Sequence, residues 1–211
     1  MILVEAFNWI LANPGIFFSA FNRHVLMCVI SLGIALAIAM PLGLVVARAP
    51  RAAFVAINVA GSLRSIPSLA ILSAAMPFLG IGLLPSVVAL VVLAVPPLLL
   101  NTVVGIREID PSILDAANGM GMARRDIRWQ IEIPLAVPSI LAGVRTSAIQ
   151  VIGGAALASF IGGGGLGDFI NAGIAIMNMP RLLVGAVPIA LLAILTEVLF
   201  GWIERSVTTR R

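Results

Sequence analysis

Five long apolar stretches divide this chain, and each is long enough to cross a lipid bilayer. A helix needs about 20 mostly apolar residues to span the hydrocarbon core of a membrane. Only 10% of the residues are charged, whereas a soluble domain carries about 25%. We therefore predict an all-α membrane protein that forms a single transmembrane domain over residues 1–211. The five predicted transmembrane helices cover residues 24–47, 54–78, 83–104, 135–161 and 182–203.

Residues 1–23 precede the first predicted span and have a different character. The sequence NPG interrupts them at residues 13–15, and Glu5 and Asn8 lie among aromatic side chains. A short apolar helix with polar residues lies in the membrane interface rather than across the membrane. The segment has neither the basic start nor the small-residue cleavage site of a signal peptide. We expect an N-terminal interfacial helix here.

All thirteen basic residues are arginine, and the loops share them unevenly. Loops rich in Lys and Arg face the cytoplasm. The arginines that follow the first, third and fifth predicted spans are Arg48, Arg51, Arg107, Arg124, Arg125, Arg128, Arg205, Arg210 and Arg211. They predict a membrane protein with its N-terminus outside and its C-terminus in the cytoplasm. The composition favours the lipid bilayer, and not nucleic acid, as the partner of these charges.

Residues 105–134 form the longest connection on the predicted cytoplasmic side. Asp110 and Pro111 predict a helix start, because a capping side chain stands before an early proline. Gly119 and Gly121 interrupt that helix, and a second short helix follows. We predict two short coupling helices that are exposed in the cytoplasm.

Small residues in this connection predict a docking surface for another protein. Ala116, Ala117 and Gly121 leave a helical surface with almost no side-chain bulk, so a partner's groove could approach the backbone closely. Pro134, at the end of the connection, predicts the start of the fourth span.

The same connection is similar to a cytoplasmic motif of importer permeases of the ABC transporter class. That motif reads EAA, three residues, Gly, nine residues, then Ile, any residue, Leu and Pro, and this chain keeps the spacing. Asp replaces Glu and Ile replaces Leu, so the charge and the apolar character are kept. The resemblance assigns ATPase coupling to Asp115, Ala116, Ala117, Gly121, Ile131, Ile133 and Pro134.

The resemblance extends from residue 24 to about residue 203. The sequences RSIPSLAIL, PFLGIG, IPLAVPSILAGVRT and IGGGGLGDFI resemble those of osmoprotectant importer permeases, which serve glycine betaine, choline or carnitine. The resemblance implies two cytoplasmic ABC ATPase subunits, a second permease that is identical or homologous, and an extracytoplasmic substrate-binding protein. It also implies that this chain holds no cofactor, because the partner ATPase binds ATP and Mg. Methionine-type permeases share GGGGLGD, so import of an amino acid such as methionine is an alternative.

The residue types present argue against an enzyme. The chain has no lysine, so a phosphate-binding loop of the GxxxxGK[ST] type is impossible. We expect no catalytic cluster and no metal site, and we predict that His24 lies at the membrane interface near a helix start. The sequence predicts a transporter subunit. The docking segment argues against an ATP-independent solute channel, and the lack of a catalytic cluster argues against a membrane-embedded enzyme.

Polar and helix-breaking residues in or beside the predicted spans are candidates for the pathway and its gate. Charge inside a membrane is costly and marks functional sites. Proline removes backbone hydrogen bonds, and a doubled proline in mid-span predicts a functional break. The candidates are Arg64, Pro96, Pro97, Arg145, Gln150, Gly164, Gly165 and Glu197.

Three structural questions stay open at this point. The predicted depths of Arg145 and Glu197 differ by only roughly 6 Å at about 1.5 Å per residue. The two side chains therefore form an ion pair, or Arg145 extends to the cytoplasmic boundary while Glu197 faces a water-filled cavity. The five glycines within residues 162–167 form a tight re-entrant or gating turn, or a flexible loop. The small residues of the fourth span pack within the chain, or against a second subunit.

Overall fold

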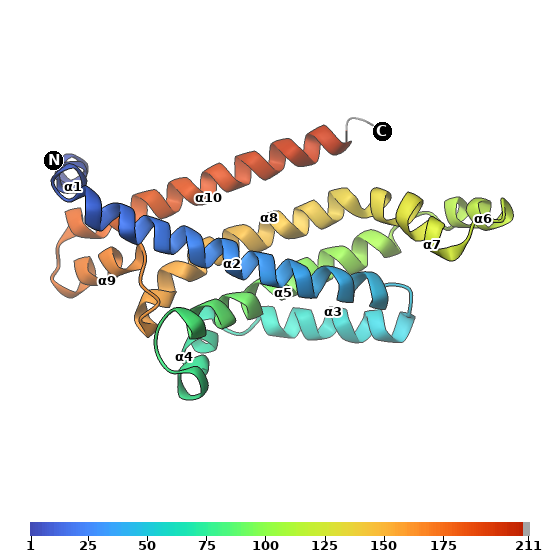
Figure 1. The fold of residues 1–211 in the computed structure, drawn as a ribbon, viewed down its shortest axis with the longest axis horizontal. Coiled ribbons are helices and arrows are strands. Elements are labelled where there is room, and N and C mark those ends of the chain that lie inside the picture. The colour runs from blue at the N-terminus through green and yellow to red at the C-terminus, as the bar shows by residue number, and fades with distance from the viewer. Residues whose placement is uncertain (209–211) are drawn as a thin grey trace.

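The computed structural model describes residues 1–208, and helices make up nearly all of that range (Figure 1). No strand occurs in these residues. The all-α prediction is therefore confirmed. Arg210 and Arg211, which contribute to the predicted orientation, lie outside the described residues.

Four long helical segments form the body of the molecule (Figure 1). They are α2 (Pro14–Val46), α5 (Leu83–Arg107), the continuous run Arg124–Ile161 and α10 (Met179–Thr208). The third of these contains α7 (Arg124–Ile127), the π-helical turn η1 (Arg128–Glu132), α8 (Ile133–Leu157) and the short 3-10 turn η2 (Ala158–Ile161). In the described part of the chain, these four are long and apolar enough to cross a membrane, and a bent pair raises the number to five.

A bent pair of helices covers the second span that the sequence predicts over residues 54–78. α3 (Pro50–Arg64) and α4 (Ser68–Leu79) meet at an angle of 93°. Pro67 stands between them in an extended conformation, with φ −56° and ψ 132°. Proline lacks an N–H and disfavours a helical conformation at the residue before it, so the helix cannot continue through this position.

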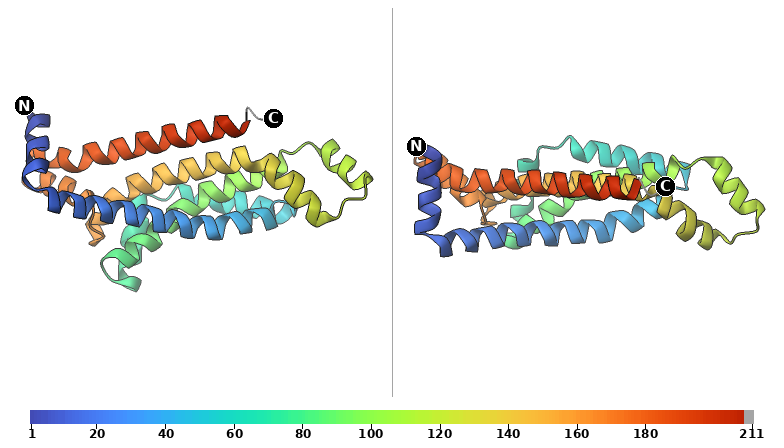
Figure 2. Two further views of the ribbon diagram at one scale, coloured as in Figure 1. Left: turned by 45° about the horizontal axis from the view of Figure 1, so that its top comes forward. Right: turned by 90° about the horizontal axis from the view of Figure 1, so that it is seen from above.

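The N-terminal segment is interrupted where the sequence predicts, but its second half belongs to the first long helix. α1 (Ile2–Ala12) ends at Asn13, and Pro14 is the first residue of α2, where proline is favourable. The first long helix therefore begins at Pro14, and the prediction that it begins at residue 24 is wrong. Figure 2 shows α1 lying across the end of the bundle.

α5 lies at the centre of the core and packs against α2 and α8. Glycines of α8 allow the close approach: a Cβ at Gly143 would lie 2.8 Å from Asn101 Cβ, and one at Gly154 would lie 2.9 Å from Leu90 Cδ2. Both small residues thus serve helix packing within the chain. Gly153, on the exposed side of α8, has open space around it.

The doubled proline does not break α5. Pro96 and Pro97 are both buried, and the helix continues through them. Neighbouring side chains donate to carbonyl groups around the pair: Ser147 Oγ to Ala94 O at 2.8 Å and Asn101 Nδ2 to Pro97 O at 2.8 Å. The prediction of a mid-span break here is wrong, because the helix continues although two N–H groups are missing.

A second, smaller core holds α1 at the opposite end from α6 (Pro111–Gly119). α9 (Gly167–Ala175) and the start of α10 contribute to it. Trp9 packs edge-on against Phe169, with ring centroids 5.2 Å apart, and the guanidinium of Arg181 lies 5.6 Å from the Trp9 ring centroid. These contacts fix α1 against the bundle.

Candidate functional site

The connection between α5 and α8 contains α6, which lies beyond the ends of the long helices (Figure 1), and α7, which is the first part of the long run Arg124–Ile161 and not a separate helix. Asp110 caps α6 by accepting a hydrogen bond from the Ser112 N–H at 2.9 Å, as the sequence predicts. That N–H holds the pKa of the Asp110 carboxyl below its usual value. The cap fixes where α6 begins.

Gly121 ends α6 in a left-handed conformation, with φ +77°. Its N–H donates to Asn118 O, and the Met122 N–H donates to Ala117 O, which is the paired hydrogen bonding of a Schellman cap. Gly121 is exposed, and a Cβ there would meet nothing within 4 Å. The backbone conformation favours a glycine here, and the glycine also leaves the surface open.

The small-residue surface is narrower than the sequence predicts. Ala116 is exposed, but Ala117 is 1% exposed and faces into the protein. It lies three residues after Leu114, on the same face of α6, and Leu114 packs against the main core. Ala116, Gly121 and the exposed Asp115 are therefore the accessible members of the first half of the motif.

The second half of the motif lies at a change of helical register. In η1, the Ile133 N–H donates to Arg128 O, five residues back. Ile131 and Ile133 are half-buried, and Pro134 follows in the first turn of α8. The helix continues from α7 through Pro134, so the helix that contains the predicted fourth span begins before this proline. A π-helical turn next to proline accommodates the missing N–H without a break, and such turns are frequent at functional sites.

Glu132, which no motif position singles out, is buried in this π-helical turn. It is 8% exposed, and its Oε1 lies 2.7 Å from Nη2 of Arg48, in the turn between α2 and α3. A cleft of about 320 Å³ adjoins the pair. The cleft is lined by Arg48, Leu114, Asn118, Arg124, Ile127, Arg128 and Glu132. The ion pair joins residues 105–134 to the end of α2.

Arg145 of α8 lies against two carboxylates of α10. Its Nη1 is 3.6 Å from Glu197 Oε1 and 3.3 Å from Glu204 Oε2. Gly201 lies between the two glutamates, and a Cβ there would be 3.7 Å from Arg145 Nη1. The predicted pairing of Arg145 with Glu197 is confirmed. Glu204 was missed, although the spacing of seven residues places it two helical turns from Glu197 on the same face.

Residues 162–167 form a packed turn against α2. Gly162, Gly164 and Gly165 have positive φ angles of 73°, 78° and 88°. Arg23 Nε donates to Gly163 O at 2.7 Å, and a Cβ at Gly164 would lie 2.7 Å from the same Nε. The geometry therefore favours the tight turn over the flexible loop.

His24 lies beneath this turn, within α2. It is fully buried, and neither ring nitrogen has a hydrogen-bond partner among the described residues. The prediction of an interfacial histidine at a helix start is wrong, because α2 begins ten residues earlier, at Pro14.

Asp168 is exposed as a whole residue, yet partial burial of its carboxyl raises its pKa, against the opposing effect of the Arg23 guanidinium.

The remaining pathway candidates do not gather into one site. Arg64 is exposed at the end of α3, beside the 93° bend. Gln150 is half-buried on α8. Pro96 and Pro97 belong to the core of α5. The described residues contain no cluster of His, Cys, Asp or Glu that could hold a metal ion.

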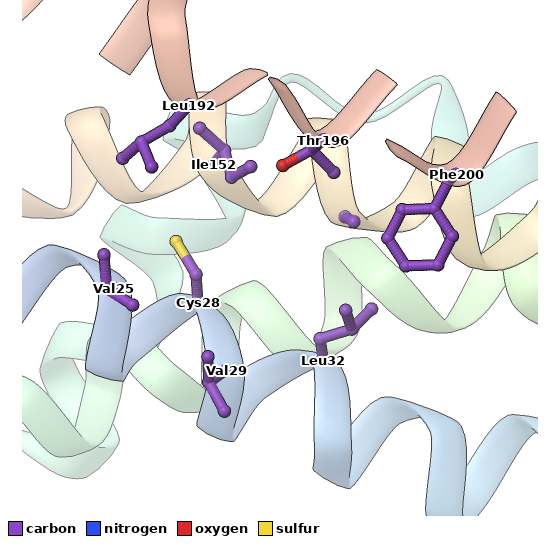
Figure 3. A pocket seen from close by; sticks show the side chains of 9 residues that line it. Val25, Cys28, Val29, Leu32, Ile152, Leu192, Thr196 and Phe200 are labelled. Carbon is purple, nitrogen blue, oxygen red and sulfur yellow. The ribbon is translucent and has the colours of Figure 1, made fainter. Parts of the chain in front are cut away.

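An apolar pocket of about 180 Å³ opens between α2, α8 and α10 (Figure 3). Cys28 and Thr196 are its least apolar members. Its lining consists of Val25, Cys28, Val29, Leu32, Ala148, Ile152, Leu192, Thr196 and Phe200. The pocket holds no set of polar groups that would orient a solute, so it is not the candidate site.

Solved structures share this arrangement of long helices. The inward-facing MetNI methionine ABC transporter contains a chain with a TM-score of 0.81 and 23% identity, matched over 91% of this chain and 96% of that one. An amino acid ABC transporter solved with histidines gives a TM-score of 0.71 at 20% identity, over 97% of this chain and 98% of that one. This chain has the ABC importer permease fold.

The chain belongs to the family of binding-protein-dependent transport system inner membrane components, whose model matches residues 33–209. It is 39% identical to the carnitine transport permease protein OpuCB of Listeria monocytogenes, over 89% of this chain and 86% of that protein. It is 37% identical to the glycine betaine/carnitine/choline transport system permease protein OpuCB of Bacillus subtilis, over 98% and 95%. It is 40% identical to the choline transport system permease protein OpuBB of Bacillus subtilis, over 88% and 86%.

Proposed function

We propose that this chain is a permease subunit of an ATP-driven, binding-protein-dependent importer of a compatible solute such as glycine betaine, choline or carnitine. The observation that carries the proposal is the 37% identity to a glycine betaine/carnitine/choline permease over 98% of this chain. The chain forms half of the translocation pathway, and a second permease, identical or homologous, forms the other half.

Residues 105–134 dock one of two cytoplasmic ATPase subunits, which bind ATP and Mg. The exposed Ala116 and Gly121 support this role, because a partner can approach the backbone of α6 there. An extracytoplasmic binding protein delivers the solute. The N-terminus lies outside and the C-terminus in the cytoplasm. In support, the arginine-bearing connections at Arg48 and Arg124 lie at the end of the bundle opposite α1 (Figure 2).

Arg145 and its two carboxylates are proposed to face the second permease or the aqueous pathway. Glu197 has a side chain that is 52% exposed, and α10 is the least buried of the long helices. Charged side chains within spans face protein or water rather than lipid, because exposure to hydrocarbon costs several kcal/mol. The turn of residues 162–167 is proposed to close the opposite end of the pathway.

Uptake by cells tests the solute class. A strain without its own osmoprotectant importers would express this chain with the ATPase, permease and binding-protein genes of its own operon. We expect uptake of radiolabelled glycine betaine, choline or carnitine, and no competition by methionine. Uptake of methionine alone would replace the proposal with the amino-acid alternative. The control strain carries an ATPase that cannot hydrolyse ATP, and uptake that persists in it would indicate a channel.

A further inference from the structure

The Arg48–Glu132 ion pair joins two connections between helices. Arg48 stands in the turn between α2 and α3, and α3 begins two residues later, at Pro50. Glu132 stands in the π-helical turn between α7 and α8. The two residues are 84 positions apart in the chain, yet their side chains approach to 2.7 Å.

The burial of Glu132 makes this contact different from a surface ion pair. Glu132 is 8% exposed, and the side chain of Arg48 is 34% exposed. An exposed pair contributes little, whereas loss of one partner from a buried pair leaves an uncompensated charge and is strongly unfavourable. The carboxylate therefore holds Arg48, and with it the α2–α3 turn, to η1.

The ion pair borders a cleft of about 320 Å³. Leu114 and Asn118 of α6 line this cleft together with Arg48 and Arg128. Figure 2 shows α6 standing away from the long helices. A force applied to α6 and α7 therefore reaches the body of the molecule at η1, where the helical register is already altered.

We infer that Arg48 and Glu132 are positioning residues that carry movement of the ATPase-docking segment to the α2–α3 turn. From there the movement reaches the bent α3–α4 pair. The inference rests on the proposed function, and it adds a second route besides the direct continuation of α7 into α8. Neither residue belongs to the motif that resembles the ATPase-docking segment.

The test uses the complete importer in proteoliposomes and measures ATP hydrolysis and solute uptake in the same sample. Arg48→Gln and Glu132→Gln are expected to keep the ATPase bound and to lower the solute transported per ATP by roughly fivefold or more, the low end of ordinary coupling between sites. Arg48→Lys keeps a charge for Glu132 and is expected to restore most of the ratio. Arg51→Gln, beside Arg48, and Glu5→Gln, in α1 at the other end of the molecule, remove exposed charges and are the matched controls.

A ratio that stays at the wild-type value in both Gln variants would overturn the inference, and so would an equal fall in the two controls. A second readout does not depend on transport. ATPase binding is expected to slow backbone hydrogen exchange around Arg48 in the wild type, but not in Glu132→Gln. Equal slowing in both proteins would overturn the inference. A wild-type complex that hydrolyses ATP without moving solute would instead count against the proposed function, and the exchange readout would still decide the inference.

Discussion

Arg145 shows how one arginine can serve two carboxylates across a helix interface. Because Glu197 and Glu204 both lie within 3.6 Å of its Nη1, removal of either glutamate leaves the arginine with a partner. Removal of the arginine takes the shared partner away from both carboxylates at once. Arg145→Met should therefore destabilise the protein by about 1–3 kcal/mol, and Glu197→Gln and Glu204→Gln should each cost less.

Thermal unfolding in detergent checks this order. Arg64→Met removes an exposed arginine from α3 and is the matched control, with little effect expected. Equal losses for Arg145→Met and the two Gln variants would mean that the three side chains act independently.

The turn of residues 162–167 leads to a second prediction. Gly164→Ala would place a Cβ 2.7 Å from Arg23 Nε at a φ of +78°, so it should displace the bond from Arg23 to Gly163 O. We expect uptake to fall at least about tenfold, a change of about 1.4 kcal/mol, while the subunits still assemble. Arg23→Gln should have the same effect without changing the glycine.

Gly153→Ala is the control, since that glycine lies in α8 and a Cβ there meets nothing within 4 Å. Uptake and pull-down of the subunits are the measurements. Normal uptake with both Gly164→Ala and Arg23→Gln would show that the turn has no role in transport.

The pairing of Arg145 with Glu197 was predictable because both residues lie in strongly apolar spans whose depths follow from residue number. Glu204 was missed because the predicted span ends at residue 203, whereas α10 continues to Thr208. Glu132 was missed because its burial depends on Arg48, which is distant in sequence. No local sequence pattern predicts a contact between two residues that are far apart in the chain.

Among the helices, α6 is the element whose surface is most directly testable. Gly121→Trp is a poor probe, because any side chain at φ +77° strains the cap as well as the surface. Ala116→Trp is sharper: the residue is exposed, in a helical conformation, and next to the motif's carboxylate. We expect it to abolish co-purification of the ATPase and to leave the thermal unfolding of the permease unchanged.

Val55→Trp, at a residue of α3 that is 57% exposed, is the control for a bulky surface residue. Gly121→Asn can adopt the left-handed conformation and should keep ATPase binding. Normal co-purification with Ala116→Trp would show that the ATPase does not contact this face of α6.

The helices themselves were predicted unequally well. Apolar length located α5 and α10, and the residues Asp110 and Pro111 located the start of α6, because these signals are local. The sequence shows a proline, Pro67, inside the second predicted span, but only the structure gives the 93° bend there, and the continuous α5 at Pro96 and Pro97 was not predicted. Proline removes a hydrogen bond in each case, and the packing of neighbouring helices decides whether the helix bends.

For the molecule as a whole, orientation is the property that the arginines predict. Single cysteines at Leu3 and Ala116, in a Cys28→Ala background and with the permease expressed without the ATPase that would cover position 116, would report it with a membrane-impermeant thiol reagent. Cys28 lines an apolar pocket, so its replacement should be tolerated. We expect labelling at position 3 in intact cells when the reagent can reach the outer face of the membrane that holds the protein. We expect labelling at position 116 only after that membrane is permeabilised. The reverse pattern would show that the protein has the opposite orientation in the membrane.

ATP-dependent accumulation in proteoliposomes tests most directly whether this chain is the permease of an ATP-driven importer. The purified permease, ATPase and binding protein would be reconstituted so that the ATPase faces a compartment containing ATP or a non-hydrolysable analogue. We predict that radiolabelled glycine betaine, choline or carnitine accumulates above its equilibrium concentration with ATP, and does not with the analogue. Uptake that stops at equal concentrations on both sides, at the same rate with either nucleotide, would contradict the importer and establish a passive channel.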